Sequence, residues 1–429
     1  MINFAKDFLN FSYKSPSAFL TIENTVKILD DFGYSKLDIK DSWELKKNQK
    51  YYLTVNDTSF FAFKTSSKNI NETFFKIVGS HTDSPSIKIK PSPEIIENDY
   101  LKLNVEIYGG PILNTWLDRP LGISGRVYTK SENAFLPKPH IININKPLMI
   151  IPNLAIHQNR EVNKGVELNR QIDMLPIATL IKEKSEQNNF LIELISKEIN
   201  VNISEILDFE IYLHEVDKGS FVGANSEFLS ASRIDNLASV YTSLLALEES
   251  ENSNCIPLIA AFDNEEIGSE TRQGADSLIL SNILERIVYS LEGNRGNFLE
   301  IISKSFMISA DGAHAIHPNK PSLTDPTNHP MLNKGPVIKL SSNFRYTTDS
   351  YTGSIIRQIA EENKINYQYF VNRSDLQGGS TIGPASSKYL PIPSIDLGIP
   401  MLSMHSIREL CGTEDLFALK NLLKEFYNY

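Results

Sequence analysis

Apolar and polar positions follow two different periodicities along the chain. Residues 2 to 34 carry apolar side chains at helical spacing, which predicts two amphipathic helices separated at Ser15-Pro16. Three short apolar runs then predict strands between residues 51 and 80. From residue 230 onward, short apolar strands alternate with helical segments, including a helix expected over residues 275 to 291. This alternation is typical of an α/β fold with a mostly parallel central sheet and helices on both faces.

The section between these two regions has a different pattern. Short strands with alternating apolar positions follow one another, separated by turns such as Gly109-Gly110-Pro111, and a helix is expected over residues 177 to 199. Because metal-type motifs and the α/β pattern lie on both sides, we predict a β-rich domain at 93–229. It is inserted into an α/β domain made of residues 1–92 and 230–429. The length of 429 residues agrees, since a single core stops growing at about 250–300 residues.

Composition argues against several classes of partner and site. The formal net charge is -10 and no block of Lys or Arg occurs, which argues against nucleic acid or an anionic membrane as a partner. Charged residues interrupt the N-terminal segment and no eighteen apolar residues run together, so we expect a cytoplasmic protein. The cysteines, Cys255 and Cys411, lack the spacing of a structural zinc site.

The most distinctive polar cluster follows the apolar run 256–262. Asp263, Glu265 and Glu266 come directly after this predicted buried strand, at the end where open α/β sheets bind their ligands. Adjacent glutamates repel each other unless they share a cation or a proton, and a divalent metal would relieve that repulsion. The alternative interpretation is a solvated turn that collects acidic residues.

Other strand ends and helix starts carry further residues of the metal-ligand type. His81 ends a strand and precedes Asp83 by two residues, a spacing that suits a histidine ligand oriented by a carboxylate. Each such residue also has an ordinary structural interpretation, for example an acid stabilised by a helix dipole. Two histidines and several carboxylates without a thiolate suit a pair of zinc, manganese or cobalt ions. The candidates are His81, Asp83, Asp235, Glu265, Glu266, Asp311 and His405.

The order of the motifs resembles the aspartyl aminopeptidase family, co-catalytic dizinc aminopeptidases that include the yeast vacuolar aminopeptidase. The motifs are HTDSP, SRIDN, DNEEIGS, ADGAHAIHPN, GPVIK, GGSTIGP and MHSIRE, and they span nearly the whole chain. The resemblance implies that the inserted β domain mediates dimerisation and that dimers assemble into a tetrahedral homododecamer. It also implies peptide substrates with a free N-terminus and two Zn2+ per subunit, for which Mn2+ or Co2+ can substitute.

The resemblance also assigns roles at the expected metal site. By motif, Asp235 would bridge the two ions, His81 and Asp311 would complete one site, and Glu266 and His405 would complete the other. Asp83 would orient His81. Glu265 would be the general base that takes a proton from the metal-bridging water and delivers it to the leaving amine. Asp263 and Glu270 match no ligand position and are expected to be surface acids.

Three further residues match positions that contact the substrate. His157 corresponds to a histidine that reaches into the active site of a neighbouring subunit, whereas His314 and Lys339 correspond to residues that line the pocket for the first side chain. The ordinary alternatives are a histidine whose ring is hydrogen-bonded within a loop and a lysine exposed to solvent. The segment 376–378, Leu-Gln-Gly, departs from relatives that prefer aspartate, so the resemblance leaves an acidic or a neutral, hydrophobic first residue open.

Two other functions remain compatible with these residues. A dizinc carboxypeptidase or amino-acid deacylase also combines an HxD motif, a Glu-Glu pair and a late histidine. A non-enzymatic metal-binding scaffold would have no use for Glu265 beside Glu266.

Overall fold

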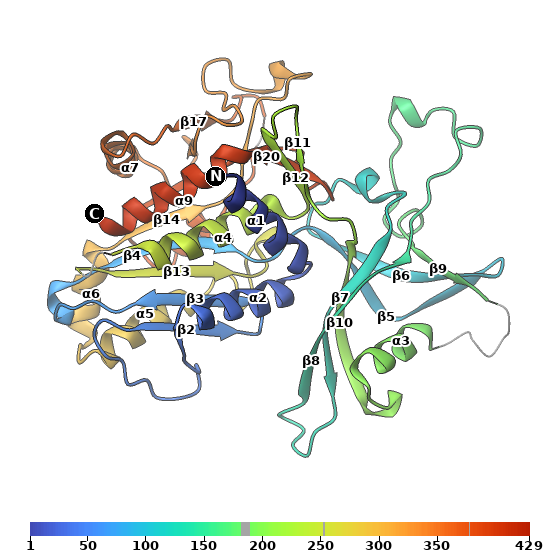
Figure 1. Ribbon diagram of the computed structural model, residues 1–429, viewed down its shortest axis with the longest axis horizontal. Helices are drawn as coiled ribbons and strands as arrows, with labels where there is room; N and C mark the ends of the chain where they lie inside the picture. The colour runs from blue at the N-terminus through green and yellow to red at the C-terminus, as the bar shows by residue number, and fades with distance from the viewer. Residues whose placement is uncertain (182–188, 252–253, 377) are drawn as a thin grey trace.

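Three sheets organise the chain in the computed structural model, which describes residues 1–181, 189–251, 254–376 and 378–429. Figure 1 shows an α/β part that contains both termini and, beside it, a second part built around another sheet. Within the described residues the central sheet has nine strands. In spatial order they are β1 (Ser35–Lys36), β2 (Lys50–Val55), β3 (Ser59–Lys64), β13 (Ile256–Phe262), β4 (Phe75–His81), β14 (Phe306–Ala310), β18 (Ser394–Gly398), β16 (Val337–Leu340) and β17 (Gln368–Val371).

The central sheet is mixed: most neighbouring strands pair in parallel, as expected, but three pairs are antiparallel. Strands β13, β4, β14 and β18 lie parallel to one another at its centre. Antiparallel pairings occur on both sides of them, between β13 and β3, β3 and β2, and β18 and β16. The parallel centre is the part that matters for the site, because all its strands end at the same edge.

Helices cover both faces of this sheet, as its all-buried central strands require. In β13, Ile259 and Ala261 pack into one apolar cluster, whereas the alternating residues Leu258, Ala260 and Phe262 pack into another. The first cluster includes residues of α1 (Ile2–Lys14), α2 (Ala18–Asp31), α4 (Ile234–Glu249), α7 (Ser350–Glu362) and α9 (Thr413–Asn428). The second includes residues of α5 (Ile279–Ser290), α6 (Arg295–Lys304) and α8 (Ile382–Ser387). The predicted break at Ser15-Pro16 is confirmed, whereas α5 begins four residues later than expected.

The second sheet is antiparallel throughout its described strands. Its order is β8 (Lys138–Met149), β7 (Leu121–Thr129), β10 (Ile206–Glu215), β5 (Ser86–Glu97), β6 (Tyr100–Tyr108) and β9 (Ile177–Leu180). It has an apolar core of its own, to which α3 (Phe190–Ile199) contributes Leu191 and Ile195. This is the β-rich insertion expected from the sequence, although its boundaries at 93 and 229 stay a prediction.

One predicted element of the insertion is wrong in part. The helix expected over residues 177 to 199 is a strand at its start, because Ile177–Leu180 pairs with the edge of β6. Among the described residues of this range, α3 is the helical part, and residues 182–188 lie outside the described part of the chain. Pairing with a distant strand overrode the local periodicity here.

A third, smaller sheet was not expected. It joins β11 (Ser220–Val222), β12 (Phe228–Ala231), β20 (Glu409–Gly412), β19 (Pro400–Leu402) and β15 (Ala313–His314). Strand β12 comes just before Asp235, β15 comes just after Asp311, and β19 and β20 lie on either side of His405 in the sequence. The sheet therefore ties together three loops that the sequence analysis identified separately.

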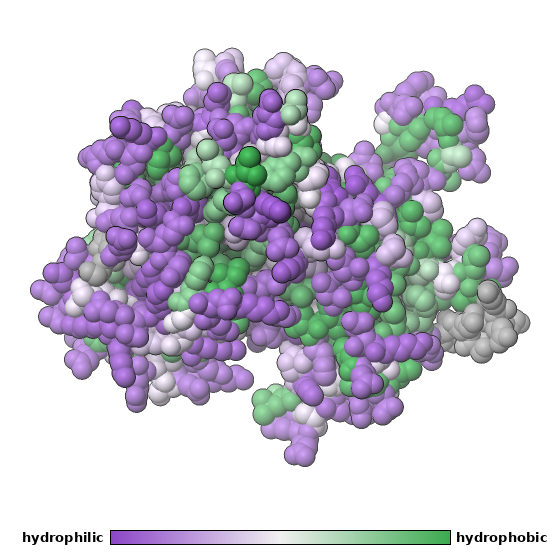
Figure 2. Space-filling model, in the orientation of Figure 1, coloured by the Kyte–Doolittle hydropathy of each residue, from purple (hydrophilic) through white to green (hydrophobic). Residues whose placement is uncertain are grey.

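The surface shows where apolar side chains remain uncovered. Figure 2 shows apolar atoms at the tip of the hairpin between β7 and β8 and in the long loop after β8. The exposed apolar residues of these segments include Phe135, Leu136, Leu154, Ile156 and Ile172. Among the described helices, none has the length and apolar character needed to cross a membrane.

Gly398 shows how tightly the central strands meet at the site edge. A Cβ atom at this position would lie 1.7 Å from the carbonyl oxygen of Asp311. Asp311 N also donates to the Leu397 carbonyl at 2.9 Å, so this backbone contact sets the position of Asp311. We expect Gly398→Ala to lower the free energy of unfolding by at least about 1–3 kcal/mol, as overpacking does. Thermal or denaturant unfolding would measure it.

Gly353 in α7 provides the matched control. A Cβ there meets no atom within 4 Å. Gly353→Ala should stabilise the protein by roughly 0.5–1 kcal/mol, because alanine is the better helix former. Equal unfolding midpoints for Gly398→Ala and the unmodified protein would contradict the close contact described above.

Candidate metal centre

Neighbouring parallel strands bring the predicted site residues to one edge of the central sheet. His81 is the last residue of β4, and Asp311 follows β14 directly. Glu265 and Glu266 lie in the 3-10 helix η6 (Glu265–Ile267), three residues after β13 ends. Asp235 lies in the first turn of α4, and its backbone φ of -80° and ψ of 108° depart from helical values there. The strand ends and the start of α4 thus meet at a single point of the fold.

Asp235 occupies the middle of this group. Its Oδ1 lies 3.3 Å from His81 Nε2, and its Oδ2 lies 3.5 Å from His405 Nε2. On one side, His81 Nε2 is also 3.5 Å from Asp311 Oδ1. On the other, His405 Nε2 is 3.3 Å from Glu266 Oε2. Asp235 therefore lies between two pairs, each made of one imidazole and one carboxylate.

The chemistry of this group fits metal ions. His81, Asp235 and Glu266 each offer a ligand atom, and these atoms lie within 4.8 Å of one another. Asp235 Oδ1 and Glu266 Oε1 are buried, and neither accepts a hydrogen bond from any residue that the structure describes. A buried carboxylate oxygen without a donor is costly, and a divalent cation would satisfy it. Nitrogen and oxygen donors in this combination suit zinc.

The electrostatics of the site reflect close packing of like charges. Burial raises the pKa of Glu266 well above its ordinary value, and the charge of Asp235 adds to this. Burial would also raise the pKa of Asp235, but contacts with His405 and His81 hold that pKa far below its ordinary value. Burial would lower the pKa of His81, yet its carboxylate neighbours, Asp235 foremost, raise it. A cation among these carboxylates would stabilise their charged forms.

Asp83 contacts His81 from behind. His81 Nδ1 lies 3.1 Å from the Asp83 backbone carbonyl and 3.4 Å from Asp83 Oδ1. Because a carbonyl only accepts, Nδ1 carries the proton and Nε2 faces Asp235 and Asp311. The Asp83 carboxylate itself accepts the backbone N–H groups of Glu265 and Glu266, each at 3.2 Å. Asp83 thus connects β4 with the turn that carries both glutamates.

Glu265 differs from its neighbour Glu266 in its contacts. It is half-buried, and its carboxylate has no hydrogen-bond partner in the described part of the chain. Burial, together with the nearby charge of Asp311, raises the pKa of Glu265 to about 8. Such a carboxyl group beside a ligand cluster is free to exchange protons.

The expectation that Asp263 is a surface acid is wrong. Asp263 is only 5% exposed, and its carboxylate accepts the Asn264 N–H at 2.8 Å. Burial and the charge of Asp83 raise the pKa of Asp263 to about 7. Glu270 is exposed as expected. Burial of Asp263 arises from residues that pack around it after folding, which the local sequence does not reveal.

Glu409 contacts two of the clustered residues directly, although the sequence did not single it out. It lies in β20, is 2% exposed, and accepts the backbone N–H of Asp235 at 3.0 Å and that of His405 at 2.8 Å. One carboxylate therefore positions two members of the group from different elements. The available signal in the sequence was the position of Glu409 at the end of the MHSIRE motif, but only the histidine of that motif was assigned a role.

The three predicted substrate residues lie in different surroundings. Lys339 is 2% exposed, donates to the Gly312 carbonyl at 2.9 Å, and has its Nζ 3.5 Å from Asp311 Oδ2. His314 is exposed beside Phe370, with ring centroids 5.8 Å apart. His157 is exposed in the loop after β8, and its ring has no hydrogen-bond partner among the described residues. Only Lys339 contacts a member of the cluster directly.

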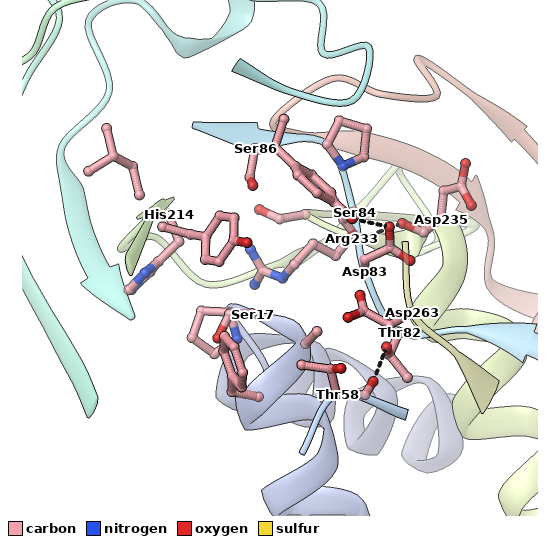
Figure 3. A pocket seen from close by; sticks show the side chains of 18 of the residues that line it. Ser17, Thr58, Thr82, Asp83, Ser84, Ser86, His214, Arg233, Asp235 and Asp263 are labelled. Atoms are coloured by element: carbon pink, nitrogen blue, oxygen red, sulfur yellow. Dashed lines mark hydrogen bonds between the residues drawn. The ribbon is translucent and has the colours of Figure 1, made fainter. Parts of the chain in front are cut away.

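A cavity of about 90 Å³ lies beside Asp83, between the two parts of the molecule. Figure 3 shows Asp83 and Asp263 on one side of it, Arg233 in the middle, and His214 of β10 opposite. Burial lowers the pKa of His214 to about 3, and its ring nitrogens have no hydrogen-bond partner among the described residues. Residues of the insertion therefore lie next to the predicted site, on the side of Asp83.

Comparisons with known proteins agree with the resemblance seen in the motifs. A model of the aminopeptidase I zinc metalloprotease (M18) family matches residues 11–427. A probable M18 family aminopeptidase 2 of Clostridium novyi is 51% identical over 428 residues, covering 100% of this chain and 99% of the relative.

Solved structures share the fold over the same length. The chain is similar to one in the complex of Ape4 and Nbr1, with a TM-score of 0.95 and 34% identity, covering 99% of this chain and 85% of that one. It is also similar to the S. cerevisiae mApe1 dodecamer, with a TM-score of 0.83 and 28% identity, covering 99% of this chain and 95% of that one.

Replacement of Glu409 tests its role in positioning Asp235 and His405. We expect Glu409→Gln to lower the free energy of unfolding by about 1–3 kcal/mol, because an amide has one acceptor oxygen for two N–H donors. Binding of zinc should also weaken. Thermal unfolding with chelator and with zinc would separate these two effects.

Glu414→Gln is the control, since Glu414 is exposed and lies five residues further along the chain. Glu414→Gln should change neither the free energy of unfolding nor that of zinc binding by more than about 0.5 kcal/mol. If Glu409→Gln behaves like Glu414→Gln, Glu409 does not hold the two backbone segments.

Proposed function

Since the chain belongs to the aminopeptidase I zinc metalloprotease (M18) family, we propose that it is a two-zinc aminopeptidase in which Asp235 would provide a ligand to both ions. It is a metallo-exopeptidase that hydrolyses N-terminal peptide bonds. The observation that carries the two-ion proposal is the position of Asp235, with one oxygen facing His81 and the other facing His405.

The proposed ligands divide into two sets that share Asp235. His81 and Asp311 would hold one ion, and Glu266 and His405 would hold the other. The short distances within each pair support this division, as does the burial of unpartnered oxygens on Asp235 and Glu266. A carboxylate has two acceptor oxygens, so Asp235 would serve both sets. Mn2+ or Co2+ has the same donor preferences and would substitute.

Glu265 would carry the proton during hydrolysis. Bound zinc supplies a lowered pKa for the attacking water and polarisation of the scissile carbonyl. The free carboxylate of Glu265 would accept the proton of that water and donate it to the nitrogen of the leaving amine. Its half-buried position beside the cluster and its lack of a competing hydrogen bond support this role. Asp83 would act through His81, whose tautomer it fixes.

Substrates would be peptides with a free N-terminus, and the first residue would be acidic or neutral and hydrophobic. Lys339 and His314 would line the pocket for that side chain. The charge of Lys339 is already balanced by Asp311 and the Gly312 carbonyl, which supports a neutral first residue. Segment 376–378 differs from relatives that prefer aspartate, and its residue 377 lies outside the described part of the chain.

Assembly into dimers and then a homododecamer would complete the active site. The likeness to the mApe1 dodecamer supports this, together with the exposed apolar residues of the β7–β8 hairpin and the loop after β8. His157 lies in that same loop and would reach a neighbouring subunit, where an imidazole donor would stabilise the developing oxyanion.

A peptide panel tests the class of substrate. Peptides that differ only in the first residue, each with a free and an acetylated N-terminus, would be incubated with the zinc-loaded protein. We expect cleavage of free N-termini only, loss of cleavage after chelation, and its return with zinc. Release of acetate or of a C-terminal residue would instead identify a deacylase or carboxypeptidase.

Replacement of Glu265 tests the proton transfer. Glu265→Gln should reduce kcat by about 10²–10⁴-fold, the usual contribution of a general base. Zinc content should stay at that of the unmodified protein, because Glu265 is not a proposed ligand. The exposed Glu270 offers a control five residues away, and Glu270→Gln should keep full activity. Full activity in Glu265→Gln would rule out this residue as the base.

A further inference from the structure

The segment Tyr108-Gly109-Gly110 follows the antiparallel sheet at the end of β6 and passes beside Glu266 and His405, two of the proposed ligands. We infer that this segment of the insertion is a positioning element that orients both histidines and Glu266 for metal binding. The inference rests on the proposed function, since it takes these three residues as ligands. It assigns the insertion a direct part in the metal site, beyond assembly.

Tyr108 acts on His81 through Asp83. Its hydroxyl donates to Asp83 Oδ2 at 2.7 Å and accepts from Asn264 Nδ2 at 2.9 Å. Asn264 is held in turn, because its Oδ1 accepts from Thr271 Oγ1 and Gln273 Nε2, both at 2.9 Å. The phenol therefore has a fixed direction, and it completes the set of donors that orient the Asp83 carboxylate behind His81.

Gly110 acts on His405 without an intermediary. His405 Nδ1 lies 3.2 Å from the Gly110 carbonyl, which can only accept, so Nδ1 carries the proton. The Nε2 atom is then left with its lone pair, and it faces Asp235 and Glu266. Ile112 N also donates to the His405 carbonyl at 2.9 Å. The chain just after β6 thus fixes both the backbone and the ring of His405.

Gly109 acts on Glu266 through contact alone. Its φ is +71°, and a Cβ at this position would lie 3.1 Å from Glu266 Cβ and 3.4 Å from the Glu266 carbonyl oxygen. A side chain here would push against the backbone of Glu266. The left-handed conformation favours glycine here, and a Cβ would fit only if Glu266 moved by a few tenths of an ångström.

The three contacts come from three consecutive residues: Gly109 and Gly110 touch Glu266 and His405 directly, whereas Tyr108 reaches His81 through Asp83. A segment that merely connects two parts of the fold would not need a carbonyl on one imidazole and a phenol on the carboxylate behind the other. Orientation of a ligand by the residues behind it typically changes metal affinity by about 10–100-fold. The expected signature of this segment is therefore a change in zinc retention.

Tyr108→Phe removes the phenol oxygen and keeps the ring. Tyr212 of β10 is the matched control, because its ring packs against that of Tyr108 with centroids 5.8 Å apart and lines the same cavity. The described residues offer its hydroxyl no hydrogen bond. The measurement is the rate of zinc release from the full-length loaded protein to a coloured chelator, with apparent zinc affinity from competition.

We expect Tyr108→Phe to weaken zinc binding about 10–100-fold, with Tyr212→Phe within about twofold of the unmodified protein. The unfolding midpoint in excess chelator should be similar for the two variants, which separates positioning from general destabilisation. Equal zinc affinity in both variants would overturn the role of Tyr108.

Gly109→Ala tests the contact with Glu266, and Gly33→Ala controls for the cost of the left-handed backbone. Gly33 has a φ of +77°, and a Cβ there would meet no atom within 4 Å. Both variants should lose some stability in chelator, but only Gly109→Ala should release zinc faster. Equal release from the two variants would overturn the role of Gly109.

The unmodified protein separates this inference from the proposed function. If it binds zinc and cleaves free N-termini while the variants retain zinc normally, only the inference fails. If it neither holds zinc nor cleaves peptides, the proposed function fails and the inference with it.

Discussion

Buried carboxylates repel one another at the edge of the central sheet, and the surrounding elements are arranged to offset that repulsion. Asp235, Glu266 and Asp311 converge on two imidazoles, and Asp83 lies directly behind one of them. Such a group is unstable unless each carboxylate has donors or a cation. The fold supplies backbone N–H groups to Asp83 and Glu409, and these two acids in turn hold the loops that carry the ligands. Metal ions would bind the carboxylate oxygens that have no hydrogen-bond donor among the described residues.

All three sheets contribute to the position of these charged residues. The parallel centre of the large sheet brings His81, Glu266 and Asp311 to one edge. The small sheet ties the segments beside Asp235, Asp311 and His405 to one another. The antiparallel insertion then adds Tyr108 and the two glycines after it from behind. An insertion that serves assembly would thereby also influence how firmly the metals are held.

The sequence predicted which polar residues lie together better than it predicted the strand pairing around them. His81, Glu266 and Asp311 could be placed together because parallel strands end at the same edge, and Asp235 and His405, from a helix start and a loop, lie beside them. Their roles as ligands stay a proposal. Strand direction is not encoded in periodicity, so the antiparallel pairs beside the parallel centre were missed. The strand at Ile177–Leu180 and the two-residue β15 exist only through distant partners. Burial of Asp263 and Glu409 likewise depends on tertiary packing.

Locating the bound zinc would show whether Asp235 contacts two ions. A crystal of the zinc-loaded protein, measured at wavelengths on either side of the zinc absorption edge, would locate each ion by its anomalous scattering. The account predicts two peaks about 3.5–4 Å apart, one between His81 and Asp311 and the other between Glu266 and His405, with Asp235 contacting both. A single peak, or zinc bound away from Asp235, would contradict it.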